Sequence, residues 1–239
     1  FKGNRAGGTE AMAAEIVWLM DGKHPYKEVY QPPIRAWMVV QQLPASIDDH
    51  TPQLEKLREF FPRRMLLGGS WIQSWSQSSY TLNLCNKGWL RLKSHGQDDK
   101  ALESEYLHYG FFDEPPPKWQ WEAMRPRLSD LRGDRLLTCT VKRQEDMWVK
   151  NEIWDQAERH VEGYFAIMMS TWDNRYLEEG EKRKMSDSFA DPDMRKAIMG
   201  EGFSMKTGPY FKEFNALIHV ARGTLEVSPR GRIMRGWDL

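Results

Sequence analysis

The order of hydrophobic and polar positions along the chain predicts strands that alternate with helices. Residues 9–21 repeat apolar positions at helical spacing, and Gly22 follows as a stop signal. Residues 34–40 form a continuous apolar run typical of a buried strand, whereas 80–85 and 88–94 alternate apolar and polar as a hairpin does. Similar patterns predict helices at 51–61, 118–128, 145–159 and 190–199, and strands at 107–114, 135–141 and 164–169. This alternation indicates an α/β domain with a largely parallel sheet.

Composition narrows the classes of protein that fit this pattern. The chain has 239 residues, 40% of them hydrophobic, which is enough for the core of one large domain. Its formal net charge is +0, so no overall field attracts nucleic acid and any polyanion contact must come from local patches. No apolar run approaches the roughly 20 residues of a membrane-spanning helix, so we expect no membrane partner. Cys85 and Cys139 lie in separate apolar segments without metal spacing, which predicts buried thiols in a reducing compartment.

A glycine-rich turn, from Lys2 to Glu10, leads into the first predicted helix. The backbone N–H groups of such a turn and the positive end of the helix dipole attract phosphate. Against the standard loop G-x-x-x-x-G-K-[ST], Gly7 takes the last glycine position and Thr9 the magnesium-binding hydroxyl, but Gly8 takes the lysine position. Lys2 stands at the first position, where glycine is usual. The alternative is an ordinary turn in front of a helix.

Two acids end the strand predicted at 107–114. At the carboxyl end of a strand, Asp113 can hold magnesium, and Glu114 can act on water as a general base. Three prolines follow, and the alternative is a solvated acidic turn. Thr138 and Thr140 end the next predicted strand, and their hydroxyls would lie beside the same ligand, because ligands gather at the carboxyl ends of parallel strands. Taken alone, the two threonines also fit ordinary β-propensity.

The order and spacing of these motifs resemble the ATPase part of the large terminase subunit, the DNA-packaging motor of tailed bacteriophages. Residues 3–10 are similar to the phosphate loop of that family, 111–116 to its Walker B motif and 137–140 to its coupling motif. Residues 199–203 and 208–214 resemble the run into its linker. The similarity covers nearly the whole chain, and the combination is more specific than any single motif.

The resemblance implies an α/β P-loop NTPase fold of the RecA/ASCE kind over residues 1–200, with its first strand expected to be missing before residue 1. Residues 201–239 would be a linker and the start of an RNase H-like nuclease domain, with Asp238 as a metal ligand. The other nuclease carboxylates are absent, so this chain is not expected to cleave DNA. The implied nucleotide-binding residues are Lys2, Gly3, Asn4, Arg5, Ala6, Gly7, Gly8 and Thr9.

The same resemblance assigns roles and partners. It implies that ATP and Mg²⁺ bind, with Thr9 and Asp113 holding Mg²⁺, Glu114 activating water and Arg5 stabilising charge on the transferred phosphate. It also implies that the hydroxyls of Thr138 and Thr140 couple hydrolysis to the movement of double-stranded DNA. The implied partners are a portal protein and a small terminase subunit. The setting would be a homo-oligomeric ring on the procapsid in the host cytoplasm.

The lysine position is where the chain departs from the family pattern. The family usually carries lysine where Gly8 stands, although some members resemble this chain in placing a lysine at the first position of the loop. Lys2 would then reach back over the phosphates. One alternative is a catalytically impaired nucleotide-binding remnant, and another is a different P-loop DNA-dependent ATPase, such as a helicase-like enzyme.

Overall fold

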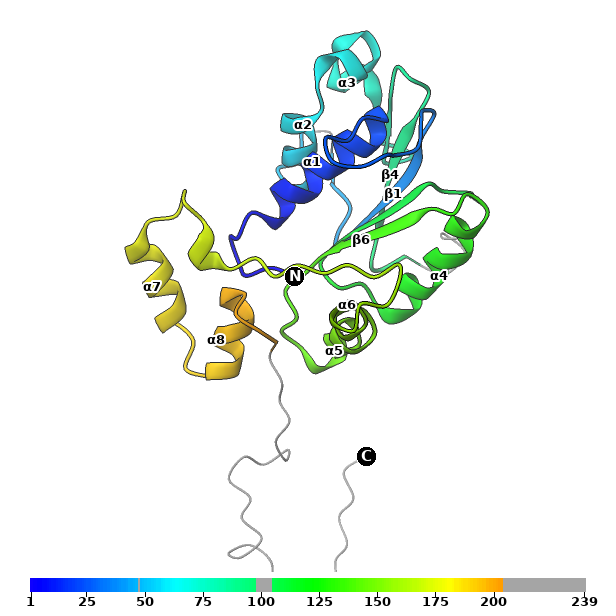
Figure 1. Cartoon of the computed structure of the whole chain (residues 1–239). Helices are drawn as coiled ribbons and strands as arrows, with labels where there is room; N and C mark the ends of the chain where they lie inside the picture. Colours follow the sequence, from blue (N-terminus) through cyan, green and yellow to red (C-terminus); the bar gives the residue numbers. More distant parts are fainter. Residues whose placement is uncertain (47, 98–104, 204–239) are drawn as a thin grey trace, which may run out of the picture. The chain divides into compact units, whose positions relative to one another are not determined.

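A mixed sheet carries the predicted motifs. The computed structural model describes residues 1–46, 48–97 and 105–203. The strands within these ranges are β1 (Arg35–Val40), β2 (Trp75–Ser76), β3 (Thr81–Asn83), β4 (Trp89–Ser94), β5 (Tyr109–Asp113) and β6 (Asp134–Thr138). They lie in the order β2-β3-β4-β1-β5-β6. Figure 1 labels β4, β1 and β6 of this sheet. The strands β4, β1, β5 and β6 are parallel, and β2 and β3 add to them antiparallel, which confirms the predicted α/β class and the hairpin.

The helices largely follow the predicted pattern. In the described ranges they are α1 (Gly8–Asp21), α2 (Pro52–Phe60), α3 (Trp71–Ser74), α4 (Lys118–Ser129), α5 (Met147–Val149), α6 (Asp155–Glu158), α7 (Glu179–Asp187) and α8 (Pro192–Met199). A π-helical turn, Lys150–Trp154, joins α5 to α6, so the helix predicted at 145–159 is present but irregular. The sequence pattern missed α7, in which only Lys182 is buried, because a helix that is polar nearly all round has no apolar stripe.

The central strand β1 is buried on both faces, as its continuous apolar run predicts. Because side chains alternate along a strand, Met38 packs with Ile16 of α1 and Leu54 of α2 in one core cluster. On the other face, Trp37 packs with Met124 of α4 in a second cluster. The sheet is therefore covered by α1 and α2 on one face and by α4 on the other.

The first residues of the chain lie beside the end of β6. The Lys2 N–H donates to the Cys139 carbonyl over 2.8 Å, the Met169 N–H donates to the Phe1 carbonyl over 2.9 Å, and the Gly3 N–H donates to the Met169 carbonyl over 2.8 Å. Residues 1–3 thus run between the chain after β6 and Met169, which places the glycine-rich turn at the carboxyl end of the sheet.

Three sequence predictions need correction. The strand predicted at 164–169 is wrong: it is irregular apart from one bridge between Lys2 and Met169, because among the described residues it finds a backbone partner only in residues 1–3. The strand predicted at 135–141 ends at Thr138. Cys85 is exposed, since β3 ends before it, whereas Cys139 is buried as predicted.

Some predictions fall outside the described ranges. Asp238 and the proposed start of a nuclease domain lie there, so they stay predictions, as does the domain boundary near residue 200. No helix in the described ranges is long and apolar enough to cross a membrane.

Candidate nucleotide-binding site

The glycine-rich turn enters α1 through a backbone conformation that suits glycine. Gly7 caps α1 with φ 87° and ψ 16°, in the left-handed region that glycine adopts without steric cost. The first N–H groups of a helix have no acceptor within the helix. No side chain among the described residues caps the start of α1. These N–H groups are therefore available to a phosphate, which is the use that helix N-termini have in phosphate loops.

The turn is held in place by the segment that precedes α7 and by the last residues of α8. The Asn4 N–H donates to the Ile198 carbonyl over 2.6 Å, and the Thr171 hydroxyl donates to the Asn4 carbonyl over 2.7 Å. A side chain on Gly3 has no room, because its Cβ would lie 2.4 Å from Oγ1 of Thr171 and 2.5 Å from the carbonyl oxygen of Met199. No sequence pattern indicates this support, because it comes from residues far along the chain.

The side chain of Lys2 passes over Gly8. A Cβ placed on Gly8 would lie 2.1 Å from Cδ of Lys2 and 3.1 Å from its Cε. The ammonium continues to the two acids, with its Nζ 3.0 Å from Oε1 of Glu114 and 3.5 Å from Oδ1 of Asp113. The lysine of the first loop position therefore runs through the space where a side chain at the usual lysine position would begin.

The two acids and the two threonines meet as the parallel sheet predicts. Asp113 is the last residue of β5 and pairs in register with Thr138, whose hydroxyl donates to Oδ1 of Asp113 over 2.9 Å. Glu114 follows in a left-handed conformation with φ 71°, and its N–H donates to the Thr138 carbonyl over 2.8 Å. The Thr140 N–H donates to Oε2 of Glu114 over 3.1 Å. Both carboxylates are thus oriented by the chain at the end of β6.

Two polar residues near Asp113 carry no sequence signal of their own. Gln53, in the first turn of α2, donates its amide to Oδ2 of Asp113 over 2.6 Å. His95 follows β4, and burial lowers its pKa while the charge of Asp113 opposes that effect. Of the two, His95 directly follows β4, and a rule that gathers the residues after neighbouring parallel strands would find it, because β4 lies beside β1 and β1 lies beside β5.

The charges of the site favour a divalent cation. Burial has the largest effect on the pKa of Lys2 and lowers it, but Asp113 and Glu114 act in the opposite direction, and the pKa is raised overall. Lys2 is thus an ammonium ion that already occupies a cation position against both carboxylates. The described residues hold no cluster of three or more His, Cys, Asp or Glu. Mg²⁺ needs only one or two carboxylates when phosphates complete its shell, so the donor set fits it.

The remaining loop residues have no tested role. Thr9 follows Gly8 in the first turn of α1, and its assignment to Mg²⁺ stays a prediction. Arg5 is exposed, with a positive φ of 57°, and its carbonyl accepts a hydrogen bond from the side chain of Asn174. Ala6 is half-buried in the turn.

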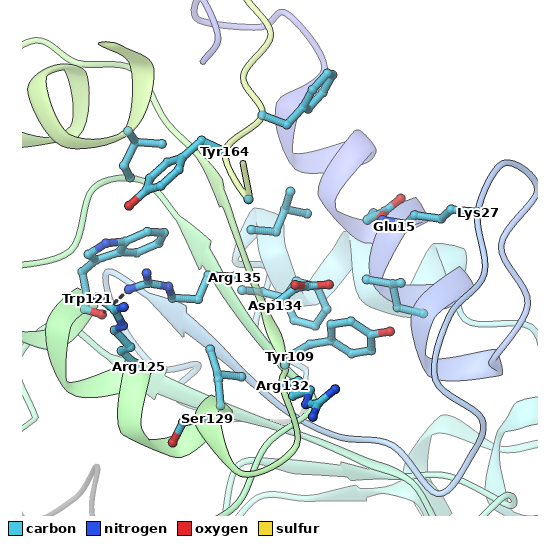
Figure 2. Close-up of a pocket in the computed structure, with 18 residues that line it drawn as sticks. Glu15, Lys27, Tyr109, Trp121, Arg125, Ser129, Arg132, Asp134, Arg135 and Tyr164 are labelled. Carbon is cyan, nitrogen blue, oxygen red and sulfur yellow. Dashed lines mark hydrogen bonds and ion pairs between the residues drawn. The ribbon is translucent and has the colours of Figure 1, made fainter. Parts of the chain in front are cut away.

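A cavity of about 570 Å³ lies apart from these residues. Its lining includes Tyr109 and Asp134, the first residues of β5 and β6, whereas the candidate site is at the last residues of the same strands. Figure 2 shows Trp121 and Arg135 along one side of the cavity, where Arg135 donates to the Trp121 carbonyl over 3.0 Å. The cavity therefore does not contribute to the candidate site.

Comparisons with known proteins identify the fold. Neither the known protein-family models nor the curated protein sequences contain a match to this chain. Among solved structures, it is similar to the large terminase of a thermophilic bacteriophage in complex with ADP, with a TM-score of 0.58 and 20% identity over 83% of this chain and 46% of that one. It is also similar to a mutant ATPase domain of the large terminase of Thermus phage P74-26, with a TM-score of 0.50 and 16% identity over 84% of this chain and 86% of that one.

The chain spans about half the length of the ADP-bound terminase, 46%. The chain has the α/β P-loop NTPase fold of large-terminase ATPase domains.

Proposed function

We propose that this chain is the ATPase part of a DNA-packaging motor. The observation that carries the proposal is the convergence of Lys2, Asp113 and Glu114 beside the start of α1. A cation, two carboxylates and free helix N–H groups in one place are the parts that phosphoryl transfer to water requires. The likeness to a large terminase that was solved in complex with ADP supports the choice of nucleotide.

In this proposal the residues divide the work of ATP hydrolysis. The N–H groups at the start of α1 bind the phosphates, and the Lys2 ammonium leaves the carboxylates to neutralise them. Asp113 and Thr9 would hold Mg²⁺, which would supply neutralisation of the phosphate charge. Glu114 then orients and deprotonates the attacking water, a role worth roughly 10²–10⁴ in rate. Arg5, at the exposed side of the turn, stabilises charge on the transferred group.

Thr138 and Thr140 pass the state of the site to the rest of the molecule. Each is bonded to one of the acids, Thr138 through its hydroxyl to Asp113 and Thr140 through its N–H to Glu114. A change in the position of either carboxylate therefore moves the chain at the end of β6. We propose double-stranded DNA as the load, a ring of copies on a procapsid portal as the assembly, and a small terminase subunit as a partner in the host cytoplasm.

ATP turnover with and without double-stranded DNA tests the proposal. We expect Mg²⁺-dependent hydrolysis that double-stranded DNA accelerates, and loss of turnover but not of ATP binding in Glu114→Gln. The matched control is Glu122→Gln, at an exposed glutamate of α4, which should keep turnover. Absence of ATP binding would refute the proposal, and ATP binding without turnover in the parent chain would favour an impaired nucleotide-binding remnant. Acceleration by single-stranded DNA alone would favour a helicase-like ATPase.

A further inference from the structure

Gln53 is anchored where it can act on Asp113. It lies in the first turn of α2, between Pro52 and Leu54, and Leu54 and Leu57 of the same helix are fully buried, with 0% exposure. These two leucines fix α2 against the core that it shares with α1. The packing of α2 therefore fixes the position of the Gln53 side-chain amide next to Asp113.

The carboxylate of Asp113 receives donors on both oxygens. Its Oδ1 accepts the Thr138 hydroxyl at 2.9 Å and faces the Lys2 ammonium at 3.5 Å. Its Oδ2 accepts the amide of Gln53 at 2.6 Å. The amide nitrogen rather than the amide oxygen must face Asp113, because two acceptor oxygens would repel. Three elements, β6, the glycine-rich turn and α2, therefore set the orientation of one carboxylate that is 1% exposed.

The donors differ in what they do once a nucleotide is bound. In the function proposed above, Lys2 moves to the phosphates and no longer holds Asp113. The neutral donors Gln53 and Thr138 have no reason to leave, since neither is attracted to phosphate by charge. They remain as the groups that keep the carboxylate oriented while Mg²⁺ is held.

We propose that Gln53 is a positioning residue that orients Asp113 for Mg²⁺ and links α2 to the nucleotide site. This inference rests on the proposed function. Groups that hydrogen-bond a ligating carboxylate tune metal affinity, and their loss typically costs 10–100-fold. Gln53 acts through Asp113 and does not touch the substrate. Because α2 is part of the core cluster with α1, the same bond carries movement of Asp113 into that cluster.

The first experiment uses no metal and no nucleotide. Thermal unfolding is measured for Gln53→Met, Asp113→Ala and the double variant, because methionine keeps the length of glutamine and its helix propensity but cannot donate. We expect the loss of melting temperature in Gln53→Met to shrink or vanish when Asp113 is alanine. The control Glu59→Ala, at an exposed residue of α2, should have the same effect in both backgrounds. An equal loss of melting temperature from Gln53→Met in the parent chain and in the Asp113→Ala background would overturn the proposal.

The second experiment titrates Mg²⁺ while binding of a fluorescent ADP analogue is recorded. We expect Gln53→Met to raise the Mg²⁺ concentration for half-maximal binding about tenfold. Glu59→Ala should match the parent chain. An unchanged Mg²⁺ requirement in Gln53→Met, with normal binding by the parent, overturns the role of Gln53 alone. Failure of the parent to bind the analogue overturns the proposed function, and the magnesium role falls with it.

Discussion

Replacement of Lys2 by methionine tests the electrostatic core of the site. The variant removes the ammonium but keeps most of the side chain that lies over Gly8. Two carboxylates then remain, with side chains 2% exposed for Asp113 and 22% for Glu114, and no cation between them. We therefore expect the folded state to lose stability, and the size of the loss follows from the distances.

The distances give a large gross attraction. At an effective dielectric constant of about 20, a charge pair at 3.0 Å is worth about 5.5 kcal/mol and one at 3.5 Å about 4.7 kcal/mol. Desolvation of Lys2, whose side chain is 12% exposed, offsets much of this attraction. Removal of one partner from a buried group costs about 3–5 kcal/mol. Taking about 3 kcal/mol, the melting temperature of a chain of this size should fall by about 6–12 °C.

Circular dichroism melts near neutral pH without nucleotide measure this loss. Glu114→Gln is the second single variant of a double-mutant cycle. We expect Lys2→Met to lower the free energy of unfolding by at least about 1 kcal/mol less in the Glu114→Gln background than in the parent chain, because Glu114 has then lost its charge. Arg143→Met removes one cation from an exposed pair with Glu145 and should leave the melting temperature nearly unchanged. The reasoning is refuted if Lys2→Met behaves like Arg143→Met, or if its effect adds to that of Glu114→Gln.

Three further predictions follow from local geometry. Gly8→Ala should keep the fold, since alanine favours helices by about 1 kcal/mol, but it should displace Lys2 and weaken binding of a fluorescent ATP analogue in a titration. Gly3→Ala should lower the unfolding free energy by about 1–3 kcal/mol in urea melts, because its Cβ meets backbone atoms that cannot move cheaply. A thiol reagent should label exposed Cys85 at once and Cys139 only on unfolding, since burial raises the pKa of Cys139 to about 12 and keeps it protonated.

Most of the elements could be predicted because their signals are local. The buried strand at β1 and the amphipathic helices α1 and α2 follow from the spacing of apolar residues. The predicted strand at 164–169 failed for a non-local reason. Its residues have strand-like side chains, but strand geometry requires a partner, and in the described part of the chain only Phe1, Lys2 and Gly3 run beside it.

The residues of the candidate site could be predicted where the topology of the sheet brings them together. The acids and threonines were placed together from the rule that parallel strands bring their carboxyl ends to one edge, and the register of Asp113 with Thr138 bears this out. Gln53 was out of reach, because a glutamine in an amphipathic helix has no distinctive pattern. The anchoring of Asn4 by Ile198 was equally hidden, since nothing in the spacing of α8 relates it to residues nearly two hundred positions earlier.

Glycine at the usual lysine position is better explained by geometry than by decay of the loop. A loop that had simply lost its lysine would leave an open space at Gly8, and any small residue would serve there. In this chain the space is filled by Cδ of Lys2, 2.1 Å from where a Cβ would stand. The two features therefore depend on each other: Lys2 can follow its path only over a residue without a side chain. Its ammonium ends against Asp113 and Glu114, the two acids at the end of β5.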